Sequence, residues 1–189
     1  MSRQLHLNLF LMARGHHEGA WRHPGANPKA LTDLELYVDA ARIAENAKFD
    51  AVFLADTLVG PENSQLVASG LLEPITLLTA MALKTERIGL IGTASTTYSH
   101  PYTLARQFAT LDHISKGRAG WNIVTSWAPK AGENYGLAEN VDHADRYRIA
   151  QEFVEAVDAL WRSFPASSIV DDAASGQFLA GGQSLIPSM

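Results

Sequence analysis

The feature that most constrains the fold of this chain is a repeated strand-then-helix pattern, clearest between Ile88 and Trp127. A short apolar run, Ile88–Gly92, leads into hydroxyl-bearing residues, and a helical segment opens at His100–Pro101 and continues through Ile114. Lys116–Gly117 ends that segment, and a second strand is expected over Arg118–Thr125. Since binding groups in α/β sheets gather where parallel strands end, this stretch is where function should be sought.

The same alternation extends over most of the chain. Strands are expected over Leu5–Met12 and Ala51–Ala55, and helices begin at Pro74 and at a candidate capping box, Thr32 to Glu35. A strong amphipathic helix follows, with His143, Tyr147, Ala150, Val154, Val157 and Trp161 on one face. Four short apolar strands alternating with four helices predict an α/β fold with a buried parallel sheet.

Composition narrows the classes of function. The 189 residues are 47% hydrophobic and 19% charged, with a net charge of -5 and no basic cluster, so nucleic acid is not an expected partner. The absence of cysteine excludes disulfides, thiolate metal sites and cysteine nucleophiles, and fits a cytoplasmic location. The apolar start, LHLNLFLM, is interpreted as a strand, and no run is long enough to span a membrane.

Polar side chains follow two of the expected strands. Asp56 directly follows an apolar strand, where it suits either a turn cap or a carboxylate that binds a ligand. The residues Thr93, Ser95, Thr96 and Thr97 offer hydroxyls after the next strand along the chain. Asn122 lies within a strand, where a buried amide requires partners. Trp127 fits a pocket wall and the core equally well.

His143 and Tyr147 are four residues apart, so they project side by side from one helix. They fit a helix cap with a core tyrosine as well as a ligand pocket. A metal site at Asp142, His143 and Asp145 is the less favoured interpretation, because no HxH or HExxH spacing accompanies it. Dinucleotide, P-loop, serine-hydrolase and paired-carboxylate signatures are also absent. A polar pocket with few acid or base groups suits a cofactor that carries the chemistry itself.

Four segments resemble the bacterial-luciferase-like flavin monooxygenases, in the branch that contains nitrilotriacetate and dibenzothiophene-sulfone monooxygenases. They are LFLMARGHHEGAWRHP, FDAVFLAD, LEPITLLTAMALKTERIGLIGTASTTYSHPYTLARQFATLDHISKGRAGWNIVTS and ENYG…HADRYRIAQEFVEAVDALW. They run in family order from Leu5 to about Trp161. The resemblance therefore covers nearly all of the periodic part of the chain.

The resemblance implies a TIM (β/α)8 barrel with reduced FMN at its C-terminal mouth, O2 as co-substrate, and electrons from a separate NAD(P)H:flavin reductase. It implies oxygenation of a small molecule at a C–N or C–S bond. The matching positions assign flavin contacts to Asp56, Thr93, Asn122, His143 and Tyr147. Among these, His143 is the candidate catalytic residue, as a hydrogen-bond partner of the substrate or the reacting oxygen.

A complete barrel takes about 250 residues, so this chain is expected to form an N-terminal half-barrel of about four βα units. We expect a barrel domain over 1–165 and an irregular tail over 166–189, with the resemblance ending after about Phe178 through a truncation of the gene. Unpaired strand edges favour association, so a homo-oligomer is expected. Three other functions stay open: a catalytically inactive half-barrel, a deazaflavin-dependent oxidoreductase and, last, a metal-dependent hydrolase.

Overall fold

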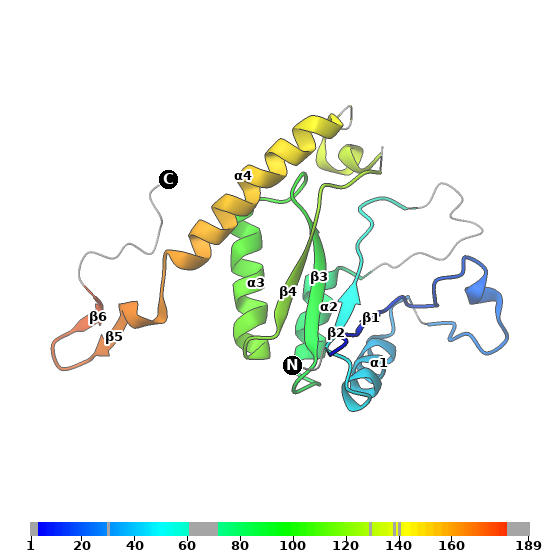
Figure 1. Ribbon diagram of the computed structural model, residues 1–189, viewed down its shortest axis with the longest axis horizontal. Coiled ribbons are helices and arrows are strands. Elements are labelled where there is room, and N and C mark those ends of the chain that lie inside the picture. Colours follow the sequence, from blue (N-terminus) through cyan, green and yellow to red (C-terminus); the bar gives the residue numbers. More distant parts are fainter. Residues whose placement is uncertain are drawn as a thin grey trace.

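The structure is a computed structural model that describes residues 4–29, 31–60, 72–128, 130–137, 139 and 141–180. In these ranges a four-stranded parallel sheet has the strand order β1-β2-β3-β4. Helices and strands alternate along the chain (Figure 1). Their bounds are β1 Asn8–Phe10, α1 Leu34–Asn46, β2 Ala51–Leu54, α2 Pro74–Ala82, β3 Gly89–Ser95, α3 Pro101–Ser115, β4 Ala119–Val124 and α4 His143–Arg162.

The strand order distinguishes between the two main kinds of parallel α/β fold. Each strand pairs with the next one in sequence, and the order never reverses. A doubly wound sheet has such a reversal, whereas a (β/α) barrel does not. The four predicted βα units are therefore confirmed, and they are wound as one side of a barrel.

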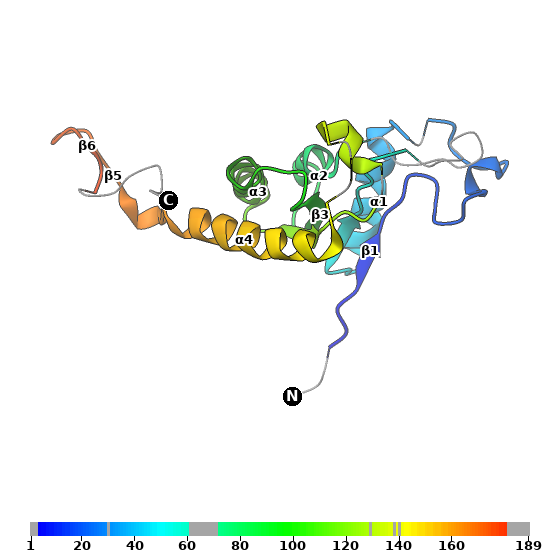
Figure 2. The same cartoon turned by 90° about the horizontal axis from the view of Figure 1, so that it is seen from above.

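Helices α1, α2 and α3 follow one another along one face of the sheet (Figure 2). Helix α4 packs beside α3 at the edge of the sheet formed by β4. The core lies between these helices and the outward side chains of the strands, which include Val52, Leu54 and Leu90. Close packing of α2 on β3 depends on Gly92, because a Cβ there would lie 2.9 Å from Leu78 Cδ1. Trp121 of β4 contacts Phe108 of α3 and Phe153 of α4, with ring centroids 5.9 Å apart in both pairs.

The opposite face of the sheet carries a second set of side chains. Phe10 and Phe53 are register partners on β1 and β2, with ring centroids 4.8 Å apart. Thr93 and Asn122 are register partners on β3 and β4. By the alternation of side chains along a strand, these four residues face what is the inside of a barrel.

Local signals explain where the helices begin and end. The N-cap of α1 is Asp33, whose carboxylate accepts from the Glu35 N–H at 3.2 Å and is also bound by Asn27 Nδ2 at 2.9 Å. The capping box predicted from Thr32 is therefore wrong by one residue. At the end of α3, Lys116 and Gly117 adopt left-handed φ values of 59° and 85°, as a C-terminal stop requires.

Beyond α4 the chain differs from the predicted irregular tail. Residues Ile169–Asp172 (β5) and Gln177–Leu179 (β6) form an antiparallel hairpin, set apart from the sheet in Figure 1. The turn is held by Asp172, whose carboxylate accepts from the backbone N–H of Ala174 and the hydroxyl of Ser175. This tight turn pairs strands too short for sequence periodicity to indicate. The remaining part of the tail, 181–189, lies outside the described residues, and the division at 165 stays a prediction.

None of the described helices combines the length and apolar character that crossing a bilayer requires.

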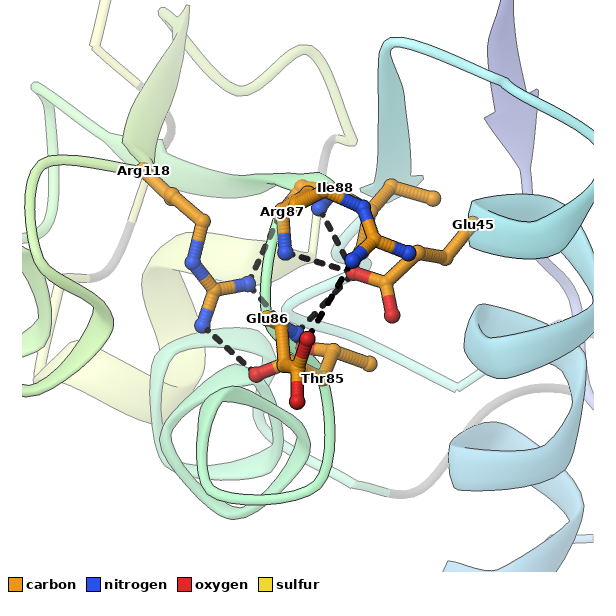
Figure 3. A network of polar contacts seen from close by, with 6 residues as sticks. All are labelled: Glu45, Thr85, Glu86, Arg87, Ile88 and Arg118. Atoms are coloured by element: carbon orange, nitrogen blue, oxygen red, sulfur yellow. Dashed lines mark hydrogen bonds and ion pairs between the residues drawn. The ribbon is translucent and has the colours of Figure 1, made fainter.

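The end of the sheet where the strands begin is fastened by Arg118 and Glu45 (Figure 3). Arg118 donates five hydrogen bonds of 2.7–3.2 Å, to the carbonyls of Ser115, Ile88, Ala82 and Thr85 and to the Thr85 hydroxyl. Five is the full number of guanidinium donors, and none of these acceptors is a carboxylate. Burial lowers the pKa of Arg118, and the charge of Glu45 partly opposes that shift.

Glu45, at the end of α1, completes the fastening. Its Oε1 accepts from the backbone N–H groups of Glu86, Arg87 and Ile88 at 2.6–2.9 Å. Burial acts to raise the pKa of Glu45, but these N–H groups together with the Arg87 charge lower it by more. The ends of three helices and the starts of two strands are thus joined by two charged side chains.

We expect Arg118→Met to lower the free energy of unfolding by about 3 kcal/mol or more, because several buried carbonyls lose their donor. Urea titration followed by circular dichroism measures the change. Arg162→Met is the matched control, since Arg162 pairs with Asp158 on the exposed side of α4, and its expected cost is below about 1 kcal/mol. Equal costs for the two variants would contradict the assigned role of Arg118.

Candidate functional site

A cavity of about 410 Å³ lies at the end of the sheet where β2 and β4 finish. This size falls within the ~300–1,000 Å³ typical of small-molecule sites. Three segments far apart in sequence build it: the residues after β2, the end of β4 with its following loop, and the first turns of α4. Its lining residues are Asp56, Thr57, Leu58, Ile123, Val124, Thr125, Ser126, Trp127, Ala128, Ala131 and Tyr147.

Asp56 lies half-buried in this cavity, two residues beyond the end of β2. Burial raises the pKa of its carboxyl group, the negative charge of Glu73 raises it further, and a hydrogen bond from the Thr57 N–H acts in the opposite direction. A carboxylate held against its solvation preference suits a ligand that supplies N–H donors. Asp56 both lines the cavity and accepts from the Thr57 N–H, so its two expected roles are compatible with the structure.

Thr93 and Asn122 are brought together on the inner face of the sheet. Asn122 Nδ2 donates to Thr93 Oγ1 at 2.9 Å, and Thr93 Oγ1 donates to the carbonyl of Leu54 at 2.8 Å. The two side chains therefore join β4, β3 and β2 through one chain of hydrogen bonds. Neither lines the cavity itself, although Val124, the next inward residue on β4, does.

His143 and Tyr147 lie side by side on the first turns of α4, with ring centroids 4.9 Å apart. Tyr147 lines the cavity. The His143 ring lies next to the Tyr147 ring and is not among the residues that line the cavity. Asp142 caps the helix by accepting from the Ala144 N–H at 3.0 Å. Within the described ranges, no group of three or more histidine and acidic side chains is placed to hold a metal ion.

Trp127 and one short helix, the latter not singled out from the sequence, complete the cavity. Trp127, which fitted both a pocket wall and the core, lines the cavity with 81% of its surface exposed. A short 3-10 helix, η2 (Ala131–Tyr135), closes one side. It is held by Asn134, which donates to the Leu58 carbonyl at 2.8 Å, and by Tyr135, whose ring stacks on Tyr98 at 4.8 Å. No sequence spacing indicates these contacts, because they join three separate loops.

Known proteins resemble this chain both in sequence and in fold. Residues 9–184 match the family model described as luciferase-like monooxygenase. The chain belongs to the luciferase-like monooxygenase family. The match continues beyond Phe178, where the sequence resemblance had been expected to end.

Individual relatives agree with this assignment. The chain is 43% identical to nitrilotriacetate monooxygenase component A of Aminobacter aminovorans, over 94% of the chain and 42% of that protein. It is 41% identical to dibenzothiophene-sulfone monooxygenase of Rhodococcus erythropolis strain XP, over 93% and 41%. A solved riboflavin lyase, described with modified FMN and riboflavin, superposes with a TM-score of 0.83 at 34% identity, over 96% and 43%.

The chain thus spans about two fifths of the length of these relatives. Four consecutive βα units over this share of a barrel-sized protein confirm the predicted N-terminal half-barrel. At this identity and coverage, the bacterial-luciferase-like resemblance and the nitrilotriacetate and dibenzothiophene-sulfone branch are also confirmed.

The raised pKa of Asp56 leads to a prediction about stability. A carboxyl group whose pKa is raised by folding costs stability once ionised, so this cost appears as pH rises through the folded-state pKa. Asp56→Asn should therefore raise the melting temperature at pH 7. It should leave the melting temperature unchanged at about pH 3, where the Asp56 carboxyl group is mostly protonated in both the folded and the unfolded chain. Differential scanning calorimetry at the two pH values measures this. A lower melting temperature at pH 7 would contradict the electrostatic account.

Proposed function

We propose that this chain forms the flavin-binding part of a monooxygenase that uses reduced FMN and O2, with the reduced flavin supplied by a separate NAD(P)H:flavin reductase. The observation that carries the proposal is the cavity at the ends of β2 and β4, which joins Asp56 and Tyr147 in a chain of this family. Bound FMN would supply the oxygen chemistry, and the protein would bind, orient and exclude water.

The cavity lining fits the ring system of a flavin. Side chains such as Leu58, Ile123 and Val124 offer apolar contact for the ring faces, and Trp127 adds an aromatic surface. Asp56 provides an acceptor for the ring N–H groups. The described residues lining this cavity include neither lysine nor arginine. The cavity therefore suits the ring better than the phosphate, which prefers cationic or helix N-terminal partners.

We propose roles for the remaining predicted residues as well. The hydrogen bond from Asn122 to Thr93 fixes the orientation of the Asn122 carboxamide on the inner face, and we assign this pair to a polar contact with the flavin. Tyr147 forms a wall of the cavity. His143, next to Tyr147, is assigned to hydrogen bonding with the substrate or the reacting oxygen.

The substrate class proposed is a small molecule oxygenated at a C–N or C–S bond. Nitrilotriacetate, named for one relative, offers C–N bonds, and dibenzothiophene sulfone, named for another, offers C–S bonds. We further propose a cytoplasmic protein that meets its reductase transiently and assembles as a homo-oligomer. The edge strands of the described sheet, β1 and β4, support the last point, because unpaired edges favour association.

The deciding experiment is an anaerobic calorimetric titration of the 189-residue chain with reduced FMN. We expect saturable binding to one site per chain. Absence of binding, under conditions where a full-length relative binds, would reject the proposed function for this chain in favour of the inactive half-barrel. Tighter binding of a reduced deazaflavin would favour the deazaflavin-dependent alternative.

Variants at the α4 residues test their assigned roles. Tyr147→Phe and His143→Ala should each weaken binding of reduced FMN or slow turnover by roughly tenfold, the effect of losing one good hydrogen bond. His113→Ala is the control, because His113 lies in the last turn of α3, at the other end of the sheet. Unchanged affinity and turnover in both α4 variants would remove these residues from the site.

A further inference from the structure

Ser126 occupies an unusual place at the edge of the cavity. It follows β4 by two residues, lines the cavity, and has a left-handed φ of 52°. This conformation is uncommon for a residue other than glycine, and side chains held in it tend to cluster at functional sites. The strained backbone therefore calls for an explanation beyond chain reversal.

Contacts on both sides hold Ser126 in this conformation. Arg146 of α4 donates from Nη1 to the Ser126 carbonyl at 3.1 Å. Just before Ser126, the Thr125 carbonyl accepts from the Thr97 hydroxyl at 2.8 Å. The loop after β4 is thus fixed to the loop after β3 and to the first turns of α4, between His143 and Tyr147.

The hydroxyl of Ser126 is oriented by a second serine. Ser95 Oγ lies 2.8 Å from Ser126 Oγ and accepts from the N–H groups of Thr97 and Tyr98 at 3.1 and 3.3 Å. A hydroxyl oxygen has two lone pairs and one hydrogen. Because two N–H groups occupy both lone pairs of Ser95, the Ser95 hydroxyl is the donor in its bond with Ser126.

This assignment leaves the Ser126 hydrogen to be donated elsewhere. Ser95 is 4% exposed and satisfied by the backbone, whereas Ser126 is at the cavity surface. Hydroxyl hydrogens rotate to suit their partners, so the direction of this bond follows from counting donors and acceptors. The hydroxyl hydrogen of Ser126 is therefore available to a ligand in the cavity.

We propose that Ser126 is a ligand-contacting residue whose hydroxyl donates a hydrogen bond to a carbonyl oxygen or ring nitrogen of the bound reduced flavin. This assignment rests on the proposed function. Ser95 and Arg146 are positioning residues: Ser95 sets the rotation of the hydroxyl, and Arg146 holds the backbone that presents it. The arrangement explains why a strained serine, rather than glycine, stands at this position.

Two substitutions separate a contact with the ligand from a purely structural role. Ser126→Ala removes the donor and retains the side-chain carbon. Ser126→Gly removes the donor and also relieves the backbone strain, because glycine adopts left-handed φ values freely. Both should weaken the affinity for reduced FMN by roughly fivefold to tenfold, as expected for one net hydrogen bond. Ser126→Gly should do so with a higher melting temperature than Ser126→Ala, because only glycine relieves the left-handed backbone.

Anaerobic calorimetric titration with reduced FMN and thermal melts of the 189-residue chain supply the two readouts. Thr110→Val is the matched control, because it removes a threonine hydroxyl on the exposed side of α3, and Thr110 does not line the cavity. Its affinity should stay within twofold of the unmodified chain. An equal loss of affinity in this control would show that the loss does not depend on the Ser126 donor.

The outcomes also separate this inference from the function on which it rests. If the unmodified chain fails to bind reduced FMN, the proposed function is rejected, and the role of Ser126 with it. If the unmodified chain binds and Ser126→Gly binds within twofold of it, the inference about Ser126 alone is wrong. Should Ser126→Ala fail to fold, Ser126→Gly decides the question.

Discussion

The five hydrogen bonds of the Arg118 guanidinium are the contact on which the remaining structure most depends. They satisfy carbonyls at the end of α2, in the loop that leads to β3 and at the end of α3. Backbone groups buried there without a donor would cost stability at each position. Arginine suits this place because its planar fork offers five donors spread over three nitrogens, whereas the lysine ammonium offers three donors from one nitrogen. The order of the helices around the strands is therefore fastened at one end of the sheet.

The other end of the strands has a different set of contacts and borders the cavity. At the cavity end, hydrogen bonds run between side chains of neighbouring strands and loops, from Asn122 to Thr93 and between Ser95 and Ser126. These bonds fix the directions of donors and acceptors rather than join helix ends. A carboxyl group with a raised pKa at Asp56 and a left-handed backbone at Ser126 are both unfavourable for folding. Such features persist where the surrounding structure is firm enough to hold them.

Local sequence patterns predicted much of this fold. The apolar strands and their alternation with helices gave the four βα units, and Pro74 and Lys116–Gly117 marked real helix ends. Finer predictions failed where a distant contact decided the outcome. Asn27 helps to make Asp33 the cap of α1 in place of Thr32. On α4, Val157 of the predicted face is buried as expected, but Phe153 outside that face is buried against Trp121, and Tyr147 from the predicted face is 58% exposed at the cavity.

The candidate site shows even more clearly that local sequence does not reveal contacts between distant segments. Asp56 and Tyr147 carried local signals, a charge after an apolar strand and a position near a helix start, and the structure brings both to one cavity. Ser126 carried none, since its significance depends on the backbone angle, on Arg146 twenty residues later and on Ser95 thirty-one residues earlier. Residue type alone does not reveal a hydroxyl whose orientation is set by three separate segments. Parallel strands make such convergence possible, because their ends meet at one edge however far apart they lie in the chain.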